Sequence, residues 1–251
     1  MHEQYKNSMK VVPILIQAGI TGFESPAAEY SERTINLNDL IHNPGAVFIW
    51  KAIDNSMQSV GIYKFDYLIC DSSAEPEHND VVVVQHEDTI TCRLLDLHRR
   101  VLVSPFNDVE PIKICEEHGI EMKGVVTISI RCHRYNVQHG NEMFDLNELI
   151  VNPSSSYIGS ASGSSMEGVG IYNSDLLLVD RRLEVKDKDI VVVNLNNEFA
   201  CKQLDIPNRM LLSANPKVSP VKINYLDTFS LEGVVTCSLR RHRLNSLPGV
   251  A

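Results

Sequence analysis

The stretch SSMEGVGIY, residues 164–172, decides how the chain is organised, because a close copy of it, NSMQSVGIY, occupies residues 55–63. The offset between the two serines is 109 residues (165 − 56 = 109). The same offset carries Asp66, Asp71 and Asp80 onto Asp175, Asp180 and Asp189, Cys92 onto Cys201, and GVVT at 124–127 onto GVVT at 233–236. A period this long exceeds that of a solenoid unit, so the sequence predicts two copies of one domain.

Each copy consists of short strand-like segments separated by turn residues. In the first copy the candidate strands are 46–51, 67–70, 80–85, 89–95, 100–104 and 124–131. Only residues 36–41 and their counterparts 145–150 need a helical turn. The predicted fold class is therefore mainly β, with one strongly bent sheet per copy and the two copies packed as an intramolecular pseudo-dimer.

The repeat also gives the predicted domain limits. Residues 1–34 form an amino-terminal arm that has no counterpart before the second copy. The first copy occupies 35–134, a short polar linker 135–143, the second copy 144–243, and a tail 244–251. A linker of this length fits two domains that pack side by side.

Composition restricts the class of protein. The 251 residues carry a formal net charge of −9 and include 43% hydrophobic residues, which is typical of a globular chain with a buried core. A stand-alone nucleic-acid binder needs a basic surface, so no direct binding to nucleic acid is expected. The apolar part of residues 10–19 is short and contains Pro13, so we expect neither a signal peptide nor a membrane span. Six cysteines without a CxxC pair favour a reducing cytoplasm, with no metal site and no cofactor.

One lysine of the second copy has an unusual setting. In a strand, Lys202 would share a face with Ala200, Leu204 and Ile206, which are all apolar. Burial on such a face lowers the pKa of a lysine, and a neutral amine can take the proton of a serine hydroxyl. Ser165, on the small-residue turn, is the candidate serine. The alternative is that the Lys202 amine reaches water along its aliphatic stem and that Ser165 is an ordinary loop residue.

Other charged residues are interpreted as structural. The basic clusters RCHR, residues 131–134, and RRHR, residues 240–243, are expected to be solvated strand ends rather than nucleic-acid sites. Asp175, Asp180 and Asp189 lie at turn and strand boundaries and are expected to form turns. No histidine or second carboxylate is spaced to make them metal ligands.

Several stretches together resemble the UmuD-like and LexA-like family of self-cleaving peptidases. GFESPAAEY at 22–30 is similar to the stretch that follows the self-cleavage site in that family, and LNDLI at 37–41 continues the match. Ser165-Met166 resembles the nucleophile motif, and Lys202 falls where the family keeps its general base. The resemblance implies a LexA/UmuD-like carboxy-terminal β domain in each copy and a catalytic dyad of Ser165 and Lys202 in the second.

The two copies depart from the family pattern in different ways. The first copy has Ser56, but Arg93 stands at the lysine position, and a guanidinium stays charged and cannot accept the serine proton. This site is therefore expected to be degenerate. The second copy keeps the dyad but has no arm of its own, so cleavage within one chain requires the arm of the first copy to enter the cleft of the second.

The resemblance implies that the scissile bond precedes a glycine in the arm. Ala18-Gly19 is the preferred bond because a small residue precedes the glycine. Thr21-Gly22 is the alternative, because it fits the register of the FESP stretch better.

The resemblance also implies a role in SOS mutagenesis. Contact with the RecA-nucleoprotein filament would stimulate cleavage, and the cut chain would serve a Y-family error-prone DNA polymerase as an accessory subunit. The first alternative is a non-enzymatic scaffold for the polymerase or RecA. A LexA-like repressor is the second alternative, although no helix-turn-helix region is recognised within residues 1–34.

Overall fold

The computed structural model describes residues 9–17, 33–41, 43–105, 109–115, 119–134 and 145–243. The chain divides into two compact units. The larger unit combines Met1–Asp39 with Cys132–Leu239, and the smaller unit combines Leu40–Arg131 with Arg240–Ala251. Each unit is thus built around the body of one copy. The domain limits and the pseudo-dimer packing inferred from the repeat stay predictions.

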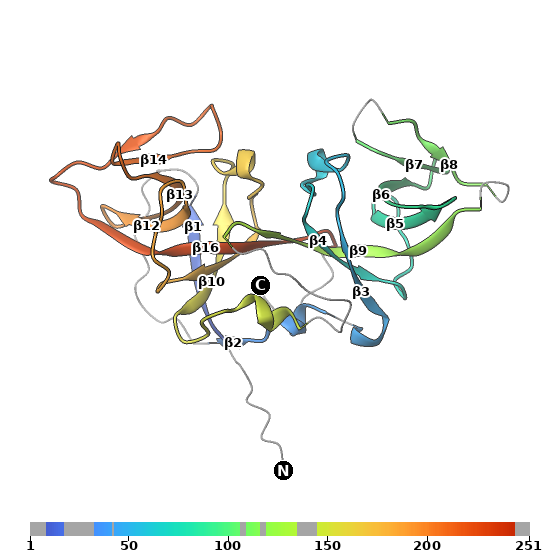
Figure 1. Cartoon of the computed structure of the whole chain (residues 1–251), viewed down its shortest axis with the longest axis horizontal. Helices are drawn as coiled ribbons and strands as arrows, with labels where there is room; N and C mark the ends of the chain where they lie inside the picture. The colour runs from blue at the N-terminus through green and yellow to red at the C-terminus, as the bar shows by residue number, and fades with distance from the viewer. Residues whose placement is uncertain are drawn as a thin grey trace, which may run out of the picture. The chain divides into compact units, whose positions relative to one another are not determined.

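The larger unit consists of strands and short 3-10 turns (Figure 1). Its elements are β1 (Met9–Gln17), β2 (Arg33–Ile35), η1 (Leu37–Leu40), η5 (Leu146–Leu149), β10 (Ser156–Ser162), η6 (Glu167–Val169), β11 (Leu176–Asp180), β12 (Ile190–Leu195), β13 (Glu198–Asp205), β14 (Met210–Leu212), β15 (Val221–Lys222) and β16 (Phe229–Arg241). The sheet order is β15-β14-β13-β1-β10-β11-β16, and β12 pairs with both β13 and β16. The chain therefore curls so that β13, which carries Lys202, lies between its hairpin partners β12 and β14.

The smaller unit repeats this plan, but no strand among its described residues is equivalent to β1. It contains η2 (Pro44–Ala46), β3 (Val47–Lys51), η3 (Gln58–Val60), β4 (Tyr67–Asp71), β5 (Val81–His86), β6 (Thr89–Asp96), β7 (Val101–Val103), β8 (Ile112–Lys113) and β9 (Glu121–Cys132). The sheet order is β9-β5-β6-β7-β8, and β4 pairs with β3 and β9. Within the described residues, every element of this unit after η2 recurs in the larger unit at or near the offset of 109 residues. The prediction of a mainly β fold in two tandem copies is confirmed.

Valine runs explain why the central strands are buried on both faces. In β12, Val192 packs into one core with Tyr157, Met166 and Cys201. Val191 and Val193 point the other way and pack with Ala200, Leu204 and Leu211. This alternation is the two-residue period of a strand that lies between two layers of side chains. Burying each large apolar side chain contributes about 1.5–3 kcal/mol, so these runs fix the place of β13 beside β12.

The interpretation of the basic clusters as solvated strand ends was wrong. Arg131 forms a two-pronged ion pair with Asp66 in the smaller unit, at 2.8 and 2.9 Å. Arg134 pairs with Asp189 in the larger unit, and the Arg243 guanidinium pairs with Asp80 in the smaller unit. The aspartates do form turns, since the Asp189 carboxylate also accepts the N–H of Lys186. Asp66, Asp80 and Asp189 also hold arginines that lie at or just beyond the ends of β9 and β16.

The end of β13 and the short helical turns also bear on the sequence predictions. Ile206 does not share the face of Lys202, because β13 ends at Asp205 and Ile206 is 44% exposed. The predicted helical turns at 36–41 and 145–150 are present as η1 and η5. In the described part of the chain, no helix has the length and apolar character needed to cross a membrane.

Candidate active site

A tight turn between β10 and η6 presents Ser165. Gly163 has φ 85° and Gly170 has φ 82°, a left-handed region that glycine enters without steric cost. Met166 fills the core beneath the turn and is 1% exposed, as expected for a packing residue. A Cβ on Gly168 would come within 2.0 Å of the Ala214 carbonyl oxygen, so the turn and this neighbouring segment are in close contact. Ser165 is consequently held in a buried position, at 2% exposure.

Two asparagines fix the turn from either side. The Gly163 N–H donates to the Asn173 side-chain oxygen at 3.0 Å. The Asn215 side-chain amide donates to the Ser164 carbonyl at 3.1 Å. These contacts immobilise the backbone directly before the serine, which is what a nucleophile needs if it is to meet its base in one geometry. Neither asparagine stands out in the sequence, because the corresponding positions of the first copy are Lys64 and Phe106.

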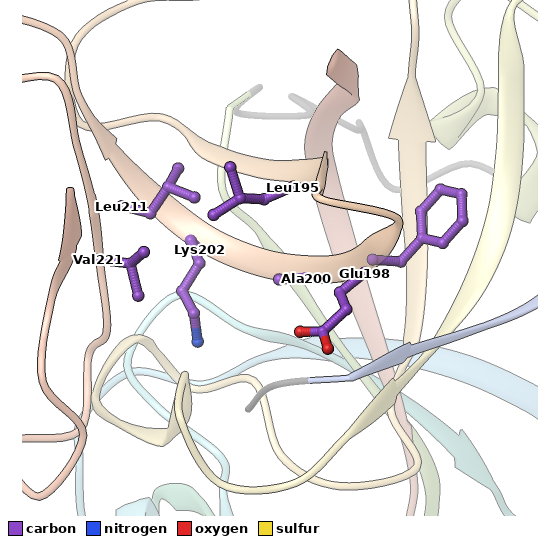
Figure 2. A pocket seen from close by; sticks show the side chains of 7 residues that line it. Leu195, Glu198, Ala200, Lys202, Leu211 and Val221 are labelled. Atoms are coloured by element: carbon purple, nitrogen blue, oxygen red, sulfur yellow. The ribbon is translucent and has the colours of Figure 1, made fainter. Parts of the chain in front are cut away.

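Lys202 lies in the middle of β13 and points into apolar surroundings. Ala200, Leu211 and Val221 are on the same side of the strand, and Figure 2 shows the lysine side chain extending beside Val221 with its amine farthest from β13. Only 2% of the residue is exposed, so the alternative that its amine reaches water does not hold. Burial lowers the pKa of the Lys202 amine below its ordinary value, because the charged form loses its hydration.

The structure brings Ser165 and Lys202 together. A hydrogen bond of 2.7 Å joins Lys202 Nζ to Ser165 Oγ. In its neutral form the amine can accept the hydroxyl proton at this distance. Within the described residues, the Ser165 N–H has no hydrogen-bond partner. A backbone N–H that is fixed next to the nucleophile can stabilise an oxyanion.

The described part of the arm lies on the second copy. β1 runs parallel to β10, with Leu15, Ile16 and Gln17 opposite Ser160, Ala161 and Ser162. Gln17 is also opposite Ala200 of β13. Figure 1 shows β1 beside β10 and β13. Since β1 is parallel to β10, it runs in the direction of the serine turn that follows β10. The candidate scissile residues Ala18, Gly19, Thr21 and Gly22 lie outside the described residues.

The corresponding residues of the first copy do not form a dyad. Arg93 donates from Nη1 to the Cys92 carbonyl at 2.7 Å, and no hydrogen bond joins it to Ser56 among the described residues. The Ser56 N–H donates to the Asp54 carboxylate at 2.8 Å. Asp54 stands where the second copy has Gly163, a difference visible in the sequence that the sequence analysis missed.

Comparisons with known proteins agree with this geometry. The Peptidase S24-like family matches the chain twice, over residues 11–127 and 125–236. Protein SamA of Salmonella typhimurium is 33% identical over 119 residues, which are 47% of this chain and 84% of SamA. Protein MucA of Escherichia coli is 37% identical over 115 residues, 45% of this chain and 70% of MucA. The LexA repressor of Bordetella parapertussis is 36% identical over 91 residues, 36% of this chain and 42% of the repressor.

Both copies of the repeat match the same family. Two consecutive domains of one type, each with the serine turn, account for 11–236 of the 251 residues. The chain therefore belongs to the Peptidase S24-like family, as a tandem fusion of two UmuD-like domains.

Proposed function

We propose that this chain is a Ser-Lys peptidase that cleaves its own amino-terminal arm and acts in SOS mutagenesis. The observation that supports it most is the 2.7 Å contact between the buried Lys202 amine and the Ser165 hydroxyl. A lysine that is only 2% exposed is costly to keep charged, because the ammonium loses its hydration. Its neutral form is the one that activates a serine.

The chemistry follows from the positions of three groups. Ser165 Oγ attacks the carbonyl carbon of Ala18 while its proton passes to Lys202 Nζ. The Ser165 N–H faces the negative oxygen that forms. Lys202 then returns the proton to the departing amine of Gly19, which leaves an ester between Ala18 and Ser165. Water, deprotonated by Lys202, hydrolyses that ester and restores the serine hydroxyl.

The register of β1 supports Ala18-Gly19 as the bond that is cut. Gln17 is opposite Ser162 and Ala200, which precede the two dyad residues by three and two positions. The described strand thus ends at Gln17, close in register to both dyad residues, which favours a bond that follows soon after Gln17. Thr21-Gly22 lies three residues further along the arm.

Similarity to SamA and MucA supports the biological setting. Both are shorter than this chain, since matches of 119 and 115 residues, about half of this chain, cover 84% of SamA and 70% of MucA. In this setting the RecA-nucleoprotein filament promotes cleavage, and a Y-family error-prone DNA polymerase receives the cut chain. A non-enzymatic scaffold for the same partners is the second candidate, favoured only by the degenerate site of the first copy.

Self-cleavage of the purified chain tests the proposal. We expect incubation at alkaline pH to release residues 1–18, detected by intact mass, at a first-order rate that does not change with protein concentration. Concentration independence is expected because the arm and the dyad belong to one chain. An intact chain after prolonged incubation, with and without RecA filament, would leave the scaffold as the remaining function. A cut in the 135–143 linker would refute the assignment of the arm.

A further inference from the structure

The first copy keeps an open groove where the second copy holds the arm. In the larger unit β10 pairs on one edge with β11 and on the other with β1. Its counterpart β3 pairs only with β4 among the described strands, so one edge of β3 presents unpaired backbone groups. An unpaired strand edge is a template to which an extended peptide can add.

A cavity of about 190 Å³ lies along this edge. Its lining is mostly apolar and includes Trp50, Ile53, Ile62, Ile90 and Thr91. Shifted by 109 residues, the segment 49–53 corresponds to 158–162, which is the part of β10 that pairs with β1. Thr91 likewise corresponds to Ala200, the residue opposite Gln17. The cavity is thus the counterpart of the place that the arm occupies on the second copy.

Two buried donors without an acceptor lie in or beside this groove: Trp50 is part of the lining, and Arg93 directly follows the lining residue Cys92. Among the described residues, Trp50 Nε1 and Arg93 Nε are buried without a hydrogen-bond partner. A buried donor without an acceptor has lost its hydration and gained no bond in exchange, so both sites favour a ligand that brings oxygen atoms. Asp54 is the acidic neighbour, and Arg93 and Lys64 both lie within its electrostatic range. Arg93 and Lys64 together carry one more positive charge than Asp54 balances, so an additional negative charge is favourable here.

We infer that the groove of the first copy binds the arm after its release, with the new carboxylate of Ala18 on Arg93. The inference rests on the proposed function, since cleavage is what creates that carboxylate. In the register that β1 holds on β10, Gln17 would lie opposite Ile53 and Thr91, and residue 18 would be directed at Arg93. A guanidinium matches a carboxylate in geometry and charge. The exchange of lysine for arginine thus turns a cutting site into a receptor for the product.

The only tryptophan of the chain provides the test, because Trp50 lines the groove. The full-length Ser165→Ala chain keeps its own arm uncut, so the groove of the second copy stays filled. A synthetic peptide with the sequence of residues 9–18, MKVVPILIQA, contains no tryptophan or tyrosine and can be added with a free or an amidated carboxyl terminus. We expect the free acid to change the Trp50 emission in a saturable way, and the amide to bind about tenfold to a hundredfold more weakly.

Matched variants identify the residue responsible. Arg93→Gln should bind the acid no better than the amide, whereas Arg99→Gln, an exposed arginine of the same copy, should bind it like the parent. Ile53→Asp, at a position 70% exposed, should weaken both peptides without affecting the fold. No saturable change in emission or heat with either peptide, or equal binding of acid and amide, overturns the inference. The titration needs no self-cleavage, so its failure and a failure of the proposed function are observed separately.

Discussion

The two copies share one turn but differ in what surrounds it. Met57 and Met166 have φ of −110° and −115°, and Gly61 and Gly170 both have φ 82°, so the backbone around the two serines is nearly identical. In the second copy the serine meets a buried amine, and its own N–H is unoccupied among the described residues. In the first copy a carboxylate already occupies that N–H.

The comparison shows that the turn geometry is maintained by packing in the core and not by the polar contacts of the serine. Met57 and Met166 anchor the two turns with 2% and 1% exposure. Their burial does not depend on which cation lies on the neighbouring strand. A serine turn without a neighbouring lysine amine can therefore keep the shape of a turn that has one, and the two turns differ in Asp54, Arg93 and their counterparts.

The largest effect on self-cleavage is expected from substitution of Ser165 or Lys202. Ser165→Ala removes the nucleophile and should abolish self-cleavage, and Lys202→Ala should do the same by removing the base. Ser56→Ala is the matched control and should cleave at the parental rate. Intact mass over time measures all three. Loss of cleavage in a folded Ser56→Ala chain would show that the first copy takes part in cleavage and would contradict the assignment of its site as degenerate.

The next largest effect is that of pH on the cleavage rate. Only the neutral Lys202 amine accepts a proton, and deprotonation increases as pH rises. The rate should therefore increase about tenfold per pH unit and level off at an apparent pKa below the ordinary 10.5, because burial lowers the pKa of this amine. Quenched time courses across the alkaline range give the profile. A rate that is flat with pH speaks against lysine as the base.

A smaller effect should follow from weakening the strand that presents the arm. Leu15→Pro and Ile16→Pro each remove one N–H from β1, and neighbouring N–H groups of a strand point to opposite edges. At least one of the two variants should therefore lose a bond to β10 and cleave about tenfold more slowly. If both cleave at the parental rate, the pairing of β1 with β10 does not contribute to presentation of the arm.

The smallest effects concern Arg134 and Arg243, which lie just beyond the ends of β9 and β16. Arg243→Gln leaves Asp80 without its ion pair in the smaller unit, and Arg134→Gln does the same to Asp189 in the larger one. Each change should cost about 1–3 kcal/mol. Hydrogen exchange should rise in 80–96 for the first variant and in 189–205 for the second. Equal changes in both segments for either variant would contradict the assignment of each pair to its own unit.

Local sequence patterns were sufficient for the elements and for the choice of Ser165 and Lys202, which the structure brings into hydrogen-bond contact. Lys202 was predictable because a strand period places it on an apolar face, and Ser165 because its turn is repeated. The roles of Arg134 and Arg243 were not predictable in this way, because Asp189 and Asp80 lie 55 and 163 residues away in sequence. The oxyanion position was missed for a different reason: only the structure shows that Asp54 reaches the N–H of Ser56.

The end of β16 has a consequence for how the protein is made. In the smaller unit the His242 N–H donates to the Thr127 carbonyl at 2.9 Å, and the His242 ring bonds the Ser129 hydroxyl at the same distance. The first copy leaves the ribosome early, but these contacts form only after residue 242 has been translated. Pairings between distant parts of a chain form slowly. The copy that is synthesised first is therefore the one completed last, and a chain that stops before residue 240 should leave the first copy, rather than the second, unfinished.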